Sequence, residues 1–350
     1  MTPPPVRLTA AQTAALAHVR ATARDRHDEA LARLGRLSGP SPGQEELCAL
    51  VREHGRITLN FHPDRLLPGG LTVAESLARD GRYRSQYETG VSNGGLSAYP
   101  GGDRDRWEEA LFGAAYHTAG VAAGDRPKYG GLNLRGHPDG ACPRFGSCHV
   151  RLRPQVNERA TFTLGDSHLG PKDTGTADTF LCVLAGLSEC AAEEGWKNGV
   201  AGPDLAGTIR ALPHAAIRTE HGRALDHYIE AQVHGTIDLA RDAEALVLDP
   251  SFAGTDAGAL LEGTAARLGI ALERHPGFAL DPADVDEEFR GPAIPPLAAL
   301  VSRDYADGGP VTAHAIGLAA ADRTGAGPET LQHLKQLWHT TVNRGRPALR

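Results

Sequence analysis

The stretch HYIEAQVHGTIDL, residues His227 to Leu239, decides the fold because its side chains alternate between apolar and polar. The apolar positions are Ile229, Ala231 and Val233, and the polar positions are Glu230, Gln232 and His234. Alternation with a period of two predicts a β-strand whose two faces have different surroundings. A polar face of this kind lies either in solvent or in a ligand cleft. Two further polar strand ends, at His62 and His168, favour the cleft.

The composition is that of a folded globular protein. Of the 350 residues, 41% are hydrophobic and 23% are charged, which is too apolar for a disordered chain. The chain has 36 basic and 43 acidic residues, giving a formal net charge of −7, and neither sign forms a long block. The charge pattern therefore gives no evidence for nucleic-acid binding or for binding to an anionic membrane.

The cysteines and the N-terminus predict a cytoplasmic protein. Five cysteines are scattered along the chain, which is typical of reduced thiols rather than of a disulfide framework. The N-terminal residues MTPPPVRLTAAQ lack the apolar segment of a signal peptide. No window approaches ~18 consecutive apolar residues, so we expect no membrane span.

Gly/Pro-rich breaks divide the chain into three parts. We expect residues 1–55 to form an N-terminal helical cap, residues 56–255 an α+β core, and residues 256–350 a C-terminal, mostly helical extension. Short strands interspersed with helices are typical of the α+β class. The predicted architecture is a central split or mixed sheet that forms a ligand cleft, flanked by the N- and C-terminal helices.

Periodicity and turn residues predict the individual elements. Strands are expected at residues 56–61, 129–135, 147–153, 160–164 and 229–233. The run at residues 244–249 is a candidate pairing partner for the last of these strands. Helices are expected at residues 14–34, 44–55, 103–124, 177–196, 203–212, 311–323 and 328–344. Capping boxes begin the first two helices, at Thr9 with Gln12 and at Ser41 with Gln44.

Common nucleotide-binding loops are missing from the sequence. It contains no GxxxxGK[ST] motif and no GxGxxG between a strand and a helix, so neither a P-loop nor a Rossmann fingerprint is supported. Residues 90–94, GVSNG, match the GxSxG nucleophile elbow. A serine hydrolase that uses Ser92 is therefore an alternative, and it requires a strand before the serine and a helix after it.

One segment, HPDGACPRFGSCH, gathers residue types that bind metals. These are His137, Cys142, Cys148 and His149. Structural zinc sites use closer pairs on tight turns, and adjacent residues of a strand point to opposite faces. We interpret the segment as a loop leading into a strand and predict no metal.

Polar or aromatic side chains occur at the ends of several predicted strands. His62, in TLNFHPDR, ends an early strand and is followed by a proline. Tyr129 in YGGLNL and Ser147 in RFGSCH begin middle strands, and Glu230 lies in a late one. This order of His, Tyr or Ser, and Glu resembles the ADP-ribosyltransferase family, in which a split sheet grips NAD without a Rossmann fold.

The resemblance implies a role for each residue. His62 would hydrogen-bond the adenosine ribose of NAD. Tyr129 would lie against the nicotinamide or support the glutamate, with Ser147 and Ser92 as substitutes. The glutamate would bind the nicotinamide ribose and stabilise the cation that forms as nicotinamide leaves, a role suited to a preorganised carboxylate.

The last strand departs from the family pattern. The usual catalytic position falls on Gln232, and Glu230 precedes it by two residues. A glutamine carries no negative charge, so either Glu230 takes the role or the site has lost or changed its activity. Both residues are catalytic candidates.

The turn in TFTLGDSH supplies two further candidates. Asp166 and His168 follow a predicted strand and are expected to line the same cleft and bind substrate. The alternative is a turn in which Asp166 caps backbone N–H groups.

The chain also resembles an uncharacterised bacterial domain-of-unknown-function family. The phrases that carry the resemblance include YETGVSNG, RFGSCH and EAQVHGTIDL, and it covers residues 56–255. The leading hypothesis is an NAD-dependent ADP-ribosyltransferase-like enzyme that uses NAD as substrate and passes ADP-ribose to an unknown acceptor. The alternatives are the Ser92 hydrolase and a catalytically inert nucleotide-binding module.

Overall fold

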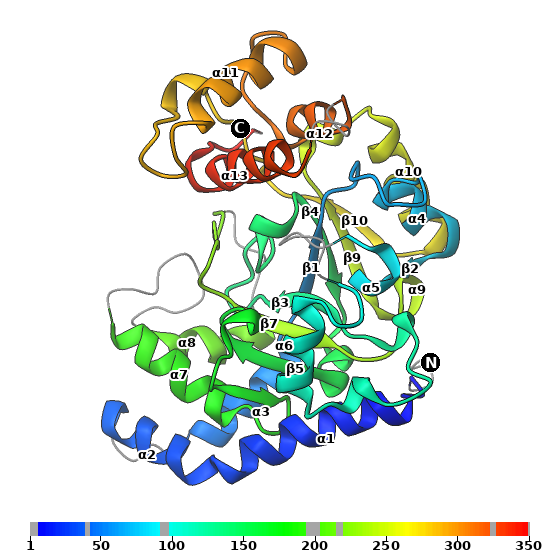
Figure 1. Ribbon diagram of the computed structural model, residues 1–350. Helices are drawn as coiled ribbons and strands as arrows, with labels where there is room; N and C mark the ends of the chain where they lie inside the picture. Colours follow the sequence, from blue (N-terminus) through cyan, green and yellow to red (C-terminus); the bar gives the residue numbers. More distant parts are fainter. Residues whose placement is uncertain are drawn as a thin grey trace.

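The central sheet has eight strands in the order β10-β9-β4-β1-β3-β7-β5-β6. The strands are β1 (Ile57–Phe61), β3 (Lys128–Leu132), β4 (Cys148–Leu152), β5 (Ala160–Leu164), β6 (Thr174–Thr176), β7 (Ile229–Val233), β9 (Ala243–Leu248) and β10 (Ala271–Arg274). Neighbours are antiparallel except β9 and β10, which are parallel. The computed structural model describes residues 6–38, 43–91, 98–193, 204–214, 220–322 and 327–348 (Figure 1). The mixed sheet with flanking helices confirms the predicted α+β class.

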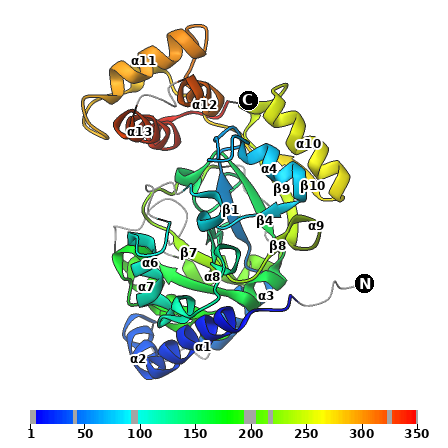
Figure 2. The ribbon, with the colours of Figure 1, turned by 45° about the vertical axis from the view of Figure 1, so that its right-hand side comes forward.

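Helices lie at both ends of the molecule. The helices are α1 (Ala10–Asp25), α2 (His27–Ser38), α3 (Gln44–His54), α4 (Val73–Asp80), α5 (Gln86–Thr89), α6 (Asp103–Phe112), α7 (Leu181–Ala192), α8 (Leu205–Arg210), α9 (Leu239–Asp242), α10 (Asp256–Leu268), α11 (Ile294–Tyr305), α12 (Ala313–Asp322) and α13 (Pro328–Arg344). In Figures 1 and 2, α1 and α2 lie at one end, and α11, α12 and α13 lie at the opposite end. Two short strands, β2 (Arg82–Tyr83) and β8 (Ile237–Asp238), form a separate pair.

The N-terminal helices differ from the prediction at one point. Thr9 and Gln12 form the predicted capping box, but the single long helix is in fact two, because the backbone leaves the helical conformation at Arg26. The turn allows α1 to contact β6 while α2 contacts α7. Helix α3 begins after Gly43, which forms no side-chain cap. The predicted cap residue Ser41 lies outside the described residues.

Helix α6 ends earlier than predicted. Gly113 adopts a left-handed conformation with φ of 59° and ends the helix after Phe112. A side chain is excluded there, since a Cβ would lie 2.4 Å from Nδ1 of His18. The chain continues in a short 3₁₀ helix, Ala115–His117.

Strand β7 lies inside the sheet, between β3 and β5, and all five of its residues are buried. Because both edges of β7 are occupied, the run at residues 244–249 cannot pair with it. This run forms β9, which pairs with β4 and β10 instead. The predicted pairing is therefore wrong. The turn at Gly235 (φ 81°), β8 and α9 separate the two strands along the chain.

Strands β1 and β3 separate along their length. Their ladder contains two pairs, Ile57 with Leu132 and Thr58 with Gly131. Strand β1 then continues against β4 as far as Phe61, while β3 continues against β7. The sheet is thus split between its two middle strands, and the split opens toward the C-terminal end of β1.

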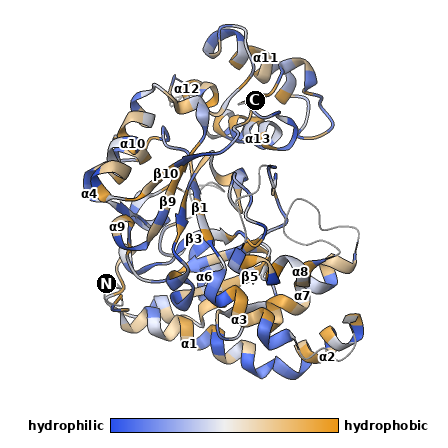
Figure 3. Ribbon diagram, turned by 180° about the vertical axis from the view of Figure 1, so that it is seen from behind, coloured by the Kyte–Doolittle hydropathy of each residue, from blue (hydrophilic) through white to orange (hydrophobic). Residues whose placement is uncertain are grey.

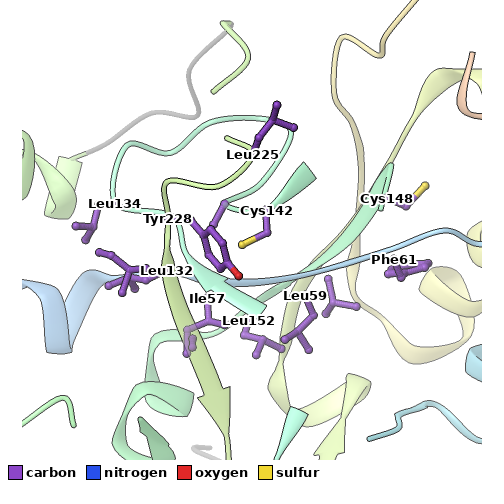
Figure 4. Packing of buried hydrophobic residues seen from close by; sticks show 14 of the residues in the cluster. Ile57, Leu59, Phe61, Leu132, Leu134, Cys142, Cys148, Leu152, Leu225 and Tyr228 are labelled. Carbon is purple, nitrogen blue, oxygen red and sulfur yellow. The ribbon is translucent and has the colours of Figure 1, made fainter. Parts of the chain in front are cut away.

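The hydrophobic core covers the sheet on both sides of this split. Figure 4 shows Ile57, Leu59 and Phe61 along β1, with Leu152 of β4 beside them, and all four are buried. Figure 3 shows hydrophobic residues along α7, which packs on β5 and β6. Among the helices that the structure describes, none is long and apolar enough to cross a bilayer.

Candidate functional site

A cavity of about 310 Å³ lies at the split. His62 reaches it from the end of β1, Tyr129 from β3 and Glu230 from β7, and the turn after β5 adds Asp166 and His168. Five of the seven residues predicted for the site therefore line one cavity. The other two, Gln232 and Ser147, do not line it.

Glu230 is the buried carboxylate of the cavity. Its side chain accepts a hydrogen bond from Nε2 of Gln232 at 2.8 Å and one from the hydroxyl of Tyr228 at 3.3 Å. The residue is only 5% exposed. Burial, with the negative charge of Asp166, raises the pKa of Glu230 to about 7. Glu230 therefore exchanges its proton near neutral pH, as functional carboxylates often do.

Gln232 supports Glu230 rather than facing the cavity. Its Oε1 accepts from the hydroxyl of Thr161 at 2.7 Å, and its Nε2 donates to Thr163 Oγ1 at 3.3 Å as well as to Glu230. Thr161 and Thr163 come from β5, where each is directly opposite Gln232 or Glu230 in the ladder. Every polar atom of the buried amide is thus used inside the protein.

Tyr129 is held by α6. Its hydroxyl donates to Oε1 of Glu108 at 2.8 Å, and the guanidinium of Arg104 lies 4.4 Å from its ring centroid. Burial raises the pKa of Tyr129 well above its ordinary value. The sequence analysis named neither Arg104 nor Trp107 as a site residue. Both line the cavity, and their spacing of three residues at the start of a helix was the available signal.

Asp166 and His168 form a close pair. Oδ1 of Asp166 lies 2.7 Å from Nδ1 of His168 and also accepts from the His168 backbone N–H at 3.2 Å. Burial opposes ionisation of Asp166, but the contacts with His168 outweigh it and lower the pKa of Asp166. The ring centroids of His168 and Trp107 are 5.5 Å apart. The contact with Asp166 orients the His168 ring through Nδ1.

The remaining predicted residues have different positions. The ring of His62 lies 5.1 Å from that of Trp338, and burial lowers the pKa of His62 to about 4, so the ring is neutral. Ser147 is buried, and its backbone carbonyl accepts from Nε2 of His275 at 2.7 Å. Ser92, the nucleophile of the hydrolase alternative, lies outside the described residues.

The cavity lining is strongly cationic. Its basic residues are Arg65, Arg82, Arg84, Arg104, Arg144 and Lys335. Its carboxylates are Asp166 and Glu230. Arg84 and Arg144 have salt-bridge partners, whereas the other four form no salt bridge within the described part of the chain. In a protein of net charge −7, such a local excess of positive charge suits an anionic ligand.

The segment that gathers His137, Cys142, Cys148 and His149 does not converge on one point. Cys142 lines the cavity, and Cys148 and His149 begin β4. Nδ1 of His137 lies 3.0 Å from the backbone carbonyl of Glu220. Across the described ranges, no three His, Cys, Asp or Glu side chains are grouped as metal ligands would be.

Comparison with known proteins gives a family and two relatives. The Gene 2 protein of Mycobacterium phage L5 is 27% identical over 173 residues, which are 49% of this chain and 59% of that protein. The Gene 2 protein of Mycobacterium phage D29 is 33% identical over 93 residues, 27% of this chain and 32% of that protein. The matches thus span less than two thirds of either relative. The model of the family described as "Protein of unknown function (DUF3626)" matches residues 56–344, and the chain belongs to this family.

Proposed function

We propose that the chain is an NAD-dependent ADP-ribosyltransferase-like enzyme. One observation carries the proposal: the split between β1 and β3 opens a single cavity that contains Glu230, Tyr129, His62 and the Asp166–His168 pair. One NAD molecule must touch all of these groups if they act together, and a shared cavity meets that requirement. The family match and the phage relatives name no activity, so the proposal rests on the site itself.

Glu230 would act at the bond that breaks. The bond between the ribose carbon and the nicotinamide nitrogen breaks, its electron pair leaves with nicotinamide, and positive charge develops on the ribose. A carboxylate fixed by Gln232 and Tyr228 stabilises that charge without having to reorganise. Glu230 thus takes the role that the family pattern places at position 232.

His168 would act on the acceptor. Asp166 orients its ring through Nδ1, so Nε2 is free to take the proton of an acceptor hydroxyl or of water. The acceptor oxygen then bonds to the ribose carbon, and the proton passes to His168. The charge balance closes because nicotinamide leaves as a neutral molecule.

The cationic lining complements the rest of the substrate. The pyrophosphate of NAD carries two negative charges, and arginine side chains are well suited to bind phosphate oxygens. Tyr129 and Trp107 offer aromatic faces for stacking with a planar ring, and both lie against Arg104.

The test is nicotinamide release from NAD by the purified chain, with and without bacterial lysate as a source of acceptor. We expect release by the wild type and by Glu109→Ala, which removes an exposed carboxylate of α6, and none by Glu230→Ala. Absence of release with calorimetric binding of NAD identifies the inert nucleotide-binding module. Absence of both release and binding refutes the proposal.

A further inference from the structure

Helix α13 borders the cavity and carries an unusual histidine. Lys335 of this helix lines the cavity, and His339 follows one turn later on the same side. His339 is only 5% exposed, yet neither ring nitrogen has a hydrogen-bond partner among the described residues. Buried polar atoms are nearly always paired in folded proteins, so this ring lacks the hydrogen-bond partner that a buried imidazole normally has.

Positive charge surrounds this histidine. Burial, followed by the charges of Arg144, Arg290 and Lys335 and by the nearby His62, lowers the pKa of His339 to about 2. The three cations come from three parts of the chain: the short 3₁₀ helix Pro143–Phe145, the segment before α11, and α13. The charges of three cations therefore act on one neutral ring.

The cations are not neutralised by the protein. Asp226 forms a salt bridge with Arg144, and its Oδ2 lies 4.0 Å from Nη2 of Arg290, but its side chain is 65% exposed. Nε of Arg144 and Nε of Arg290 are buried, and neither has a hydrogen-bond partner in the described ranges of the chain. The charges of two carboxylates, Asp166 and Asp226, act on Lys335, and two carboxylates against three cations leave a net positive charge. Within the part of the chain that the structure describes, four nitrogen atoms of the cluster have no hydrogen-bond partner.

We propose that Arg144, Arg290, Lys335 and His339 form a binding site for a phosphoryl group, here called the α13 phosphate site. A phosphate offers several acceptor oxygens and negative charge, which the two guanidinium groups and the ammonium group can bind through charge-assisted hydrogen bonds. The imidazole N–H can donate to the same group. The site adds to the proposed function a place where phosphate groups bind. Only the identity of the phosphate-bearing ligand rests on the proposed function.

The first test is calorimetric titration of the full chain with inorganic phosphate. We expect Lys335→Met to weaken phosphate binding about tenfold, since a hydrogen bond to a charged group is lost. Lys172→Met removes an exposed lysine on the surface and should leave the affinity unchanged. Equal phosphate affinity in all three proteins, or no binding by the wild type, overturns the proposal.

A second variant separates binding from folding. His339→Leu removes two unpaired buried nitrogen atoms, so we expect a higher thermal midpoint in phosphate-free buffer together with weaker phosphate binding. A variant with unchanged phosphate affinity excludes His339 from the site. If His339→Leu does not fold, Lys335→Met still tests the proposal, because Lys335 is only half-buried.

Competition with NAD identifies the source of the phosphate. If phosphate and NAD exclude one another, the site binds the pyrophosphate of the dinucleotide. If both bind at once, it binds a phosphate of the acceptor. Phosphate binding that depends on Lys335 in a protein that neither binds nor cleaves NAD supports the site and refutes the proposed function, so the two failures can be told apart.

Discussion

Glu230 makes the stability of the fold depend on pH in a predictable direction. Its pKa rises from an ordinary 4.5 to about 7 on folding. Between these values the folded chain holds a proton that the unfolded chain has released, so stability falls by ~1.4 kcal/mol for each pH unit. The stability contributed by the protonated side chain is complete below pH 4.5 and is lost as the pH rises through about 7. The total change is roughly 3 kcal/mol.

Glu230→Gln removes this titration while keeping the shape of the side chain. The new amide oxygen can still accept from Gln232 Nε2, as Oε1 of Glu230 does at 2.8 Å. The measured quantity is the unfolding free energy of the variant minus that of the wild type. We expect this difference to increase by roughly 2–3 kcal/mol as the pH rises from 5 to 8, because only the wild type loses stability over this range. Urea denaturation at half-unit pH intervals measures the difference. Glu109→Gln, at an exposed position, should show no such trend.

The same proton controls the proposed activity. Because only the carboxylate stabilises the ribose cation, we expect nicotinamide release by the wild type to increase as the pH passes about 7, the range over which stability falls. If the difference in unfolding free energy between Glu230→Gln and the wild type does not change with pH, Glu230 does not titrate as a buried carboxylate. The same conclusion follows if the wild type becomes relatively more stable at high pH. Burial that destabilises the fold is expected of a catalytic carboxylate.

Two further predictions test the split and the acceptor side of the cavity. Gly130→Ala would place a Cβ 2.4 Å from the backbone oxygen of Thr58, where β1 and β3 begin to separate, so we expect a loss of about 1–3 kcal/mol in urea denaturation. Gly263→Ala, in open space on α10, should be neutral or stabilise by up to ~1 kcal/mol. His168→Gln should lower the rate of ADP-ribose transfer about 100-fold without changing the dissociation constant for NAD; weaker NAD binding at an unchanged rate would instead make His168 a binding residue.

Local patterns predicted most strands because alternation and turn residues are local properties. The strands at β4, β5 and β7 lie where the sequence placed them. Pairing is not local, and the partner of β9 was predicted wrongly because nothing near residues 244–249 reveals that both edges of β7 are already filled. Helix α11 went unpredicted because Pro295 and Pro296 lie in its first turn, where proline is tolerated although it usually indicates a loop.

Site residues could be predicted where a polar residue type is unusual for its place in a strand. They could not be predicted where only their position in the folded structure brings them to the site. His62 and Glu230 stand out as polar groups at strand positions. Lys335 and His339 lie on a predicted helix, and each follows a buried neighbour, Leu334 or Trp338, by one position. Only the fold shows that Lys335 lines the cavity and that His339 is buried one turn further along the helix.

The polar face of β7 is neither a solvated surface nor a uniform cleft. Glu230 reaches the cavity, whereas Gln232 bonds to Thr161 and Thr163. His234 is fully buried, with a 2.5 Å hydrogen bond between its Nδ1 and the hydroxyl of Tyr116. The sequence contains a sign of this division, since the threonines of TFTL alternate in the same way as the polar residues of β7. Two strands with matching polar faces satisfy each other inside a sheet, so only the position nearest the split is left to bind a ligand.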